Sequence, residues 1–268
     1  MGKLLKIESI KTFSSNTFRT LISLHLIFFL LVILTLSKID ISMGTFSVEK
    51  LYQFPHVYDF FAWISSWFNI LLAIIVIVLV SNEFRYRTFK QHIIDGLSRE
   101  DLILGKINVL LIIAVYGLIL VFLASIVSGF IMNGDDVSFY RGMDILLIYF
   151  VQTLSYISMG MLFAILFRNN ALAIITFILY LFPGELIIRK LFFPSVENYF
   201  PAKLISDLTP FPEYVTQGFS MQGLSGQMNV NAQVEHTLSQ GQSVIISGIY
   251  LIIFLAISYW LLKKRNLT

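Results

Sequence analysis

The sequence predicts an all-α integral membrane protein with six transmembrane helices, an N-terminal interfacial helix, and a short cytoplasmic helix between the second and third spans. Of its 268 residues, 57% are hydrophobic and 13% are charged, whereas about a quarter of the residues in a soluble domain are charged. The mean hydropathy is +0.80. The apolar residues form runs long enough to cross a bilayer core of roughly 30 Å. Cysteine is absent, which excludes disulfides, thiolate metal sites and thiol catalysis.

Six apolar runs define the expected spans. Five of them are long enough on their own: residues 18–36, 61–80, 107–131, 145–167 and 244–262. The remaining run, residues 171–182, is the fifth in chain order and corresponds to only about 18 Å of helix at a rise of about 1.5 Å per residue. Continuation through Pro183 to Ile188 supplies the missing length with a kink, which membrane helices tolerate. We therefore predict a kinked fifth span.

Lys and Arg residues are concentrated on one side of the expected membrane. The side of the N-terminus holds 13 of the 19 Lys and Arg residues and five of the 16 Asp and Glu residues, so its net charge is +8 against −5 opposite. Because cytoplasmic loops carry the excess of basic residues, both termini are predicted to be cytoplasmic. The pI near 9.0 therefore reflects basic residues that flank the apolar spans. We expect these residues to contact the lipid bilayer, and we expect no nucleic acid as a partner. The chain plan suits a multi-pass protein of the bacterial cytoplasmic (inner) membrane.

Residues 1–17 are expected to form the interfacial helix and its end. Basic and apolar residues alternate from Lys3 to Phe13, which is typical of an amphipathic helix in the headgroup region. The polar stretch 14–17 then provides caps for the turn into the first span. The alternative is a plain basic flank that only fixes the topology.

Residues 81–106, between the second and third spans, combine charge with helical periodicity. Tyr86, Phe89, Ile93 and Leu97 recur at spacings of three and four, which predicts one face of a helix. An ion pair is expected within this segment between Glu83 and the arginine four residues later, Arg87, because the acidic residue comes first.

Turn signals follow that helix. Gly96 predicts a helix stop, and Ser98 and Asp101 have the spacing of a capping box. The segment therefore predicts a short helix along the membrane surface, a sharp turn, and a new helix that enters the third span. The alternative is a solvated connector whose arginines only enforce orientation.

The stretch Asn82-Glu-Phe-Arg-Tyr-Arg-Thr-Phe-Lys-Gln91, followed by Gly96-Leu-Ser-Arg99 and Lys106, resembles the permeases of type 2 ATP-binding-cassette (ABC-2 type) transporters. In that family an acidic residue and a basic-x-Thr-x-basic pattern follow the second span, and a Ser-Arg and a Lys open the third. The resemblance covers most of the chain and implies one ABC-2 type transmembrane domain over residues 1–268.

The resemblance implies that residues 81–106 are the coupling segment, whose helix sits in a cleft of a cytoplasmic ATPase. Exposed parts of the stretch 86–90 are expected to touch that partner. Carried over by position, the expected coupling residues are Glu83, Arg85, Tyr86, Arg87, Thr88, Phe89, Lys90, Gly96, Ser98 and Arg99.

The function implied is that of a permease subunit that pairs with a second permease subunit, identical or different, and with separate cytoplasmic ABC ATPase subunits for ATP-driven export. The chain has no G-x-x-x-x-G-K-[S/T] pattern, so we expect no enzyme activity and no cofactor in this chain, and ATP and Mg on the partner ATPase. No acidic or basic residue lies in the middle of the five long apolar runs, which argues against an ion-coupled carrier. The charge-poor spans favour an amphipathic or lipidic cargo.

Two other functions remain open at this stage. One is a non-transport membrane scaffold that recruits a cytoplasmic partner through the basic helix 83–99. The other is an intramembrane hydrolase that uses His25, although no accompanying catalytic motif is present. Hydrogen bonding between helices is the expected role of the polar residues in the spans, which are Asn69, Gln152, Thr153, Ser155 and Ser158.

Residues 183–243 are expected to lie outside the cytoplasm as a re-entrant and loop segment. In the family this region folds into short helices that dip into the outer leaflet. Prolines break it into pieces here, and residues 216–243 are rich in Gly, Gln, Ser and Asn, which indicates a flexible loop. A gate for exported cargo and a plain connector are both compatible with this composition.

Overall fold

The computed structural model describes residue 8 and residues 10–36, 42–43, 46–94, 96–133, 139–212, 214 and 238–264. Within these residues the regular secondary structure is helical except for one short antiparallel pair, β1 (Ser42–Met43) and β2 (Phe46–Ser47). A 3-10 helix, η1 (Val48–Tyr52), follows this pair. The prediction of an all-α architecture is therefore confirmed apart from four strand residues.

Six helices of the described chain are long and apolar enough to cross a membrane, as the six apolar runs predict. The protein is therefore a multi-pass membrane protein. The spans are α2 (Asn16–Leu36), α3 (His56–Arg85), α5 (Arg99–Asn133), α6 (Asp144–Phe167), the combined helix Asn170–Phe192, and α11 (Gln240–Lys264). The helices α3 and α5 extend beyond the predicted apolar runs, because polar residues continue the helix at their ends.

The helix α6 is the centre of the bundle and packs against α3, α5, α11 and α7 (Asn170–Leu179). Gly160 lets α3 approach, since a Cβ at this position would lie 2.9 Å from the carbonyl oxygen of Ala73. The close packing of α3 on α6 therefore depends on the absence of a side chain at this position. Buried polar groups also join these helices: Thr153 donates to Asn69 Oδ1 at 2.9 Å, and Gln152 lies within hydrogen-bond distance of Asn69.

The fifth span is continuous through Pro183. A π-helical turn, η2 (Tyr180–Gly184), carries this proline and joins α7 to α8 (Glu185–Phe192). Proline has no N–H for the helical ladder, and a local π adjustment is one way in which membrane helices absorb that loss. The predicted continuation of the fifth span through Pro183 is confirmed, and the span ends at Phe192, four residues beyond Ile188.

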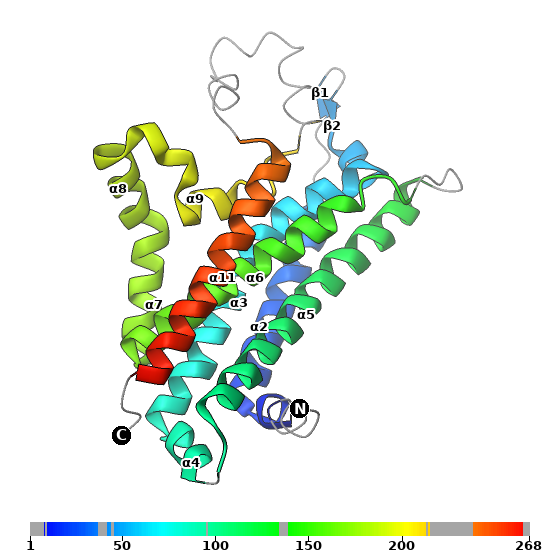
Figure 1. Cartoon of the computed structure of the whole chain (residues 1–268). Coiled ribbons are helices and arrows are strands. Elements are labelled where there is room, and N and C mark those ends of the chain that lie inside the picture. The colour runs from blue at the N-terminus through cyan, green and yellow to red at the C-terminus, as the bar shows by residue number, and fades with distance from the viewer. Residues whose placement is uncertain are drawn as a thin grey trace.

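After α8 the chain turns back toward the bundle (Figure 1). It forms η3 (Pro194–Tyr199) and α9 (Pro201–Ser206), and α9 contacts α6 and α11. The short helices expected here are present. The buried carboxylate of Glu185 holds them, because it accepts the backbone N–H groups of Ala202 at 2.8 Å and Lys203 at 2.7 Å.

Most of the predicted loop 216–243 lies outside the described residues, but its last four residues correct the prediction. Residues 240–243 form the first turn of α11. The cause is a capping box: the Ser239 N–H donates to the Gln242 side chain at 3.2 Å, and the Gln242 N–H donates to Ser239 Oγ at 3.4 Å.

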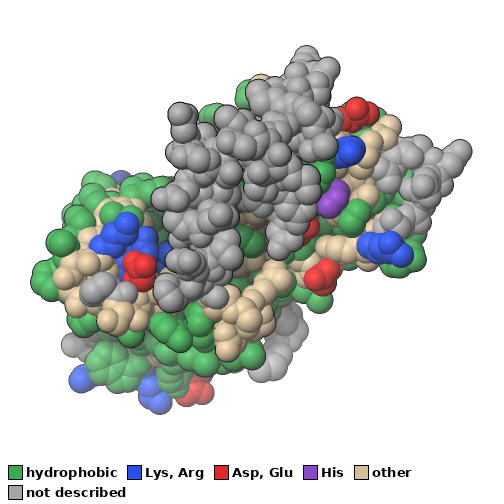
Figure 2. Space-filling view, turned by 90° about the horizontal axis from the view of Figure 1, so that it is seen from above, with side chains coloured by type: hydrophobic (Ala, Val, Ile, Leu, Met, Phe, Trp, Pro, Cys, Tyr) green, Lys and Arg blue, Asp and Glu red, His purple; other side chains and the backbone are tan. Residues whose placement is uncertain are grey.

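The start of α2, the helix α4 (Thr88–Ile94) and the end of α11 lie at the same end of the bundle (Figure 1). We call this the basic end, after Lys11, Arg85, Arg87, Lys263 and Lys264, which lie there. The face opposite carries side chains of both charge signs, with Lys and Arg next to Asp and Glu (Figure 2).

Candidate functional site

The connection between α3 and α5 folds as a helix, α4, bounded by two left-handed residues. The helix α3 ends at Arg85, and Arg87 takes a φ of 56°. At the other end of α4, Gly96 takes a φ of 92°. Its N–H donates to the carbonyl of Ile93 at 3.1 Å, and the next N–H donates to the carbonyl of His92 at 3.0 Å. This pair of bonds is the Schellman motif, so the helix stop predicted at Gly96 is confirmed.

The start of α5 carries the predicted capping box. The Ser98 hydroxyl donates to Asp101 Oδ2 at 2.7 Å, and the Asp101 N–H donates to Ser98 Oγ at 3.1 Å. The Ser98 N–H also donates to the Asp101 carboxylate at 3.2 Å. The predicted sequence of short helix, sharp turn and new helix is therefore confirmed as secondary structure.

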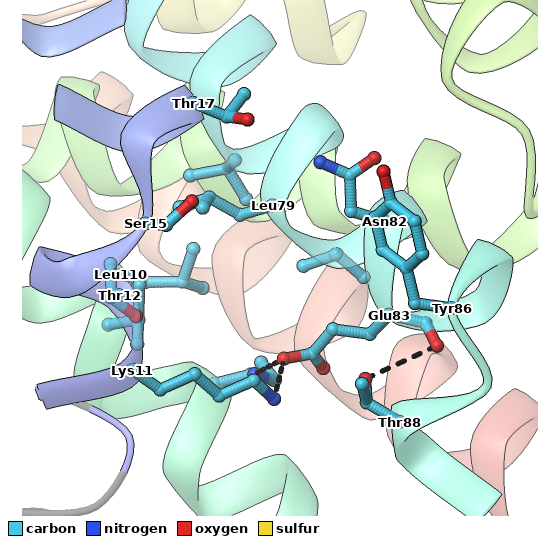
Figure 3. A pocket seen from close by; sticks show the side chains of 14 residues that line it. Lys11, Thr12, Ser15, Thr17, Leu79, Asn82, Glu83, Tyr86, Thr88 and Leu110 are labelled. Atoms are coloured by element: carbon cyan, nitrogen blue, oxygen red, sulfur yellow. Dashed lines mark hydrogen bonds and ion pairs between the residues drawn. The ribbon is translucent and has the colours of Figure 1, made fainter. Parts of the chain in front are cut away.

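A buried charge cluster lies between α4 and the helix bundle. We use this name for Glu8, Lys11, Glu83, His92 and Lys106. Lys106 Nζ donates to Glu8 Oε2 at 2.7 Å and to Glu83 Oε1 at 2.6 Å. Lys11 Nζ donates to the same Glu83 oxygen at 2.5 Å and lies 3.2 Å from His92 Nε2. Figure 3 shows Lys11 extended toward the Glu83 carboxylate.

This arrangement corrects one expectation. Glu83 pairs with Lys11 and Lys106, and no ion pair joins it to Arg87 in the described part of the chain. The reason is local geometry: α3 ends at Arg85, and the left-handed Arg87 breaks the helical repeat that would have placed the two side chains together. The Thr88 hydroxyl contacts the Glu83 carbonyl at 3.4 Å across this break.

Three members of the cluster are deeply buried, and the cluster is balanced in charge. Lys106 is 6% exposed, Glu83 7% and Glu8 4%. Two carboxylates face two ammonium groups, and the ring of Phe89 lies 5.9 Å from Lys106 Nζ. Burial of charge is costly unless each group keeps its partner, and removal of one partner leaves an uncompensated charge. The cluster therefore fixes the ends of α3 and α5 to the N-terminal helix.

The residues of the expected coupling segment divide into an inner and an outer set. Phe89 is buried at 2% exposure, and Glu83 and Thr88 face inward with it. Tyr86 is 65% exposed and Ile94 74%. Tyr86 therefore does not share the buried face that its spacing from Phe89 predicts, because it lies in the break before α4.

The outer set contains the exposed residues of the turn and of α4. It consists of Arg85, Tyr86, Arg87, Gln91 and Ile94. The Arg85 guanidinium lies over the Tyr86 ring at 5.6 Å. Two arginines and an exposed aromatic residue next to an exposed aliphatic residue are the side chains that protein interfaces favour.

The remaining expected residues have structural contacts or turn positions. Arg99 donates from Nη1 to the carbonyls of Leu262 at 3.3 Å and Lys263, and so ties the start of α5 to the end of α11. Gly96 and Ser98 are exposed. The backbone of Lys90 belongs to α4, whereas its side chain lies outside the described residues.

Sequence reasoning missed the contribution of the N-terminal segment to this site. Residues 10–14 are helical, as is residue 8, whereas residues 1–7 and 9 of the expected interfacial helix lie outside the described residues. Ser15 caps the start of α2, where its Oγ accepts the Phe18 N–H at 3.5 Å. The available signal was Glu8, the single acidic residue among the basic residues that precede the first span.

A cavity of about 190 Å³ adjoins the charge cluster, between the N-terminal segment, α3 and α5. Figure 3 shows Ser15, Thr17, Asn82 and Leu79 around it. Among the described residues, no group of three or more Asp, Glu or His side chains is arranged to hold a metal ion.

Three of the five polar residues in the spans, Asn69, Gln152 and Thr153, form the predicted hydrogen bonds between helices, whereas Ser155 and Ser158 bond within their own helix. His25 is buried, with Nδ1 at 3.1 Å from the hydroxyl of Tyr116 and its ring stacked on Phe29. This environment gives His25 a packing role between α2 and α5.

Comparison with known proteins supplies a family. A protein-family model described as "Protein of unknown function (DUF2705)" matches residues 43–268. A comparison with curated proteins finds no match. The matched range includes all of α3 to α11 and therefore the whole exposed turn, whereas Glu8 and Lys11 precede it.

Proposed function

The chain belongs to the DUF2705 family of proteins of unknown function, and we propose that this member is the permease subunit of an ABC-2 type transporter. In this proposal the basic end faces the cytoplasm of a bacterium, and the exposed turn receives a cytoplasmic ABC ATPase. A second permease subunit completes the membrane pathway, through which cargo is exported.

The observation that carries the proposal is the combination of an exposed turn and a rigid mount. The end of α3 and the turn after it present Arg85, Tyr86 and Arg87 outward, and Ile94 is exposed at the end of the seven-residue helix α4. Its inner side rests on the buried charge cluster through Phe89 and His92. A force applied to the exposed side chains would therefore reach the ends of α3 and α5 directly, because the buried cluster resists separation.

The helix α3 offers a path from the basic end to the opposite end. Its 30 residues correspond to about 45 Å at about 1.5 Å per residue. Near its middle, Asn69 bonds to α6, and Gln152 of α6 donates to the carbonyl of Ile205 in α9 at 2.9 Å. Movement of α3 would thus be felt by the short helices at the far end, which in this proposal border the exit of the pathway.

A separate ATPase is required because the sequence has no phosphate-binding loop. ATP and Mg would be held by that partner. The mostly exposed apolar surfaces of α2 and α7 supply faces for lipid and for the second permease subunit. The interfacial position of the N-terminal helix and the coupling role of α4 are parts of the same proposal.

The proposal predicts a specific loss of coupling. The substitution Arg87→Glu reverses the charge of an exposed residue in the turn before α4, so insertion into the membrane is expected to stay normal. Substrate-stimulated ATP hydrolysis by the reconstituted complex is expected to be abolished, because the docking surface no longer matches the ATPase. The matched control is Arg141→Glu, which reverses an exposed arginine in a turn at the opposite end and is expected to leave hydrolysis unchanged.

A rate of ATP hydrolysis equal to that of the wild type in the Arg87→Glu complex would contradict the assignment of this turn as the ATPase-coupling site. The scaffold alternative is separated by mass spectrometry of the proteins that co-purify with the tagged chain in mild detergent. A stoichiometric ATPase supports the permease, whereas a different cytoplasmic protein in equal amount, with no ATPase, supports the scaffold.

A further inference from the structure

The cavity beside the charge cluster, which we call the basic-end cavity, is lined by both polar and apolar side chains. The polar ones include Lys11, Ser15, Asn82 and Glu83. The apolar ones come from α3 and α5 and include Leu79 and Leu110, which we call the apolar wall. A cavity with polar and apolar lining is complementary to an amphipathic molecule, since each part of the ligand can meet groups of its own kind.

The two oxygens of the Glu83 carboxylate have different surroundings. Oε1 accepts hydrogen bonds from Lys11 and Lys106. Oε2 is buried and has no hydrogen-bond partner among the residues that the structure describes. Because an ionised carboxylate only accepts hydrogen bonds and a buried acceptor is costly to leave unpaired, the favoured ligand is a hydrogen-bond donor at this position.

The charges around the cavity constrain the ligand further. Two carboxylates and two ammonium groups balance within the cluster, so a ligand without net charge preserves that balance. Lys11 is the more accessible lysine, with a side chain 32% exposed against 7% for Lys106. It can therefore offer a hydrogen to an anionic group while Glu83 accepts from a cationic one. These are the two charges of a zwitterion.

We propose that the basic-end cavity binds the headgroup of phosphatidylethanolamine, with its ammonium donating to Glu83 Oε2 and its phosphate accepting from Lys11. The acyl chains leave along the apolar wall, past Leu79 and Leu110. The apolar wall selects a membrane lipid over a water-soluble zwitterion with the same headgroup. This lipid site does not depend on a partner ATPase and stands apart from the proposed transport function.

The test uses the wild-type chain and a series of lipids that lose donors one at a time. Native mass spectrometry in detergent would measure the lipid retained from phosphatidylethanolamine, its N-methyl and N,N-dimethyl forms, and phosphatidylcholine. The retained lipid is expected to fall about tenfold from the first to the last, as for loss of a hydrogen bond to a charged group, with the methylated forms between them. Equal retention across the series would overturn the proposal.

Two variants and a control locate the lipid. Glu83→Gln replaces a carboxylate oxygen with an amide donor, so the preference for phosphatidylethanolamine is expected to disappear. Leu79→Trp fills the cavity and is expected to remove the retained lipid altogether. Leu123→Trp, at an exposed position of α5 that does not line the cavity, is expected to behave as wild type.

Each contrary outcome has a definite meaning. If the Leu79→Trp variant still prefers phosphatidylethanolamine, the lipid binds elsewhere. If the wild-type chain retains no more lipid than the Leu79→Trp variant, the cavity holds only water. Either result overturns the proposal. Full competition by soluble phosphoethanolamine would also overturn it, in favour of a water-soluble ligand. If Glu83→Gln does not fold, the lipid series and Leu79→Trp decide the question.

Discussion

Each end of the bundle contains a buried glutamate, and the two are stabilised in different ways. Glu83, at the basic end, accepts from the ammonium groups of Lys11 and Lys106. Glu185, at the opposite end, accepts from two backbone N–H groups at the start of α9 and from the hydroxyl of Tyr180 at 2.6 Å. The first carboxylate is held by full charges on other elements, and the second by peptide and hydroxyl dipoles.

The difference shows what each end can do. At the basic end, loss of any one of the two carboxylates and two ammonium groups leaves an unbalanced charge in the cluster, so the three elements are expected to move together. At the opposite end, loss of the carboxylate leaves only uncharged N–H groups at a helix start, which water can satisfy. The basic end is therefore suited to transmit force as a unit, whereas the α8–α9 contact can open at a lower free-energy cost.

The largest effect on stability is expected from Lys106→Met. It leaves Glu8 and Glu83 buried with Lys11 as their only lysine partner, and breaking a buried ion pair in this way costs about 3–5 kcal/mol. Equilibrium unfolding in detergent measures the change. The double variant Glu83→Leu/Lys106→Met removes one charge of each sign and is expected to be more stable than Lys106→Met alone. Strictly additive losses would show that the two residues do not act as a pair.

A smaller and local effect is expected from Glu185→Ala. The start of α9 loses its acceptor, at a cost of about 1–3 kcal/mol for hydrogen bonds to a charged group. Hydrogen exchange should become faster at the amides of Ala202 and Lys203, while the amides of α4 keep their protection. Glu197→Gln is the matched control, because its ion pair with Arg189 is longer, at 3.6 Å, and partly exposed. Faster exchange at both ends would contradict the idea that the two ends are independent.

The smallest effect on stability is expected from Tyr86→Ala, within about 0.5 kcal/mol as for ordinary surface substitutions. Because Tyr86 is 65% exposed and lies on the proposed docking surface, binding of the partner should nevertheless weaken. The amount of ATPase that co-purifies with the variant measures this. Tyr140→Ala alters a tyrosine of similar exposure, 64%, at the opposite end and serves as the control. Equal partner recovery from both variants would exclude Tyr86 from the interface.

The parts of the fold that depend on local sequence could be predicted. The spans follow from apolar runs, and the kinked fifth span follows from the length of its run and from Pro183. The stop at Gly96 and the capping box of Ser98 and Asp101 are also local, because each involves residues within a few positions of one another. These features could be predicted because they depend only on residues that are close together in the sequence.

The charge cluster could not be predicted in the same way. Its members are far apart in the sequence, since Glu8 and Lys106 are separated by 98 positions, and no helical repeat brings them together. The expected pairing of Glu83 and Arg87 assumed that α3 continues through both residues. The left-handed conformation of Arg87 shows that this assumption is wrong. Glu83 pairs with the distant Lys106 instead of the neighbouring arginine.

The π-helical turn at Tyr180–Gly184 sets the rotational phase of the helix that follows it. A π-turn accommodates one residue more than an α-helical turn, and each residue of an α-helix advances by about 100°. Deletion of one residue from this turn would therefore swing Glu185 by about that angle, away from the start of α9. The extra residue acts as a spacer that aims the carboxylate, so the chain length of this turn matters as much as the residue types in it.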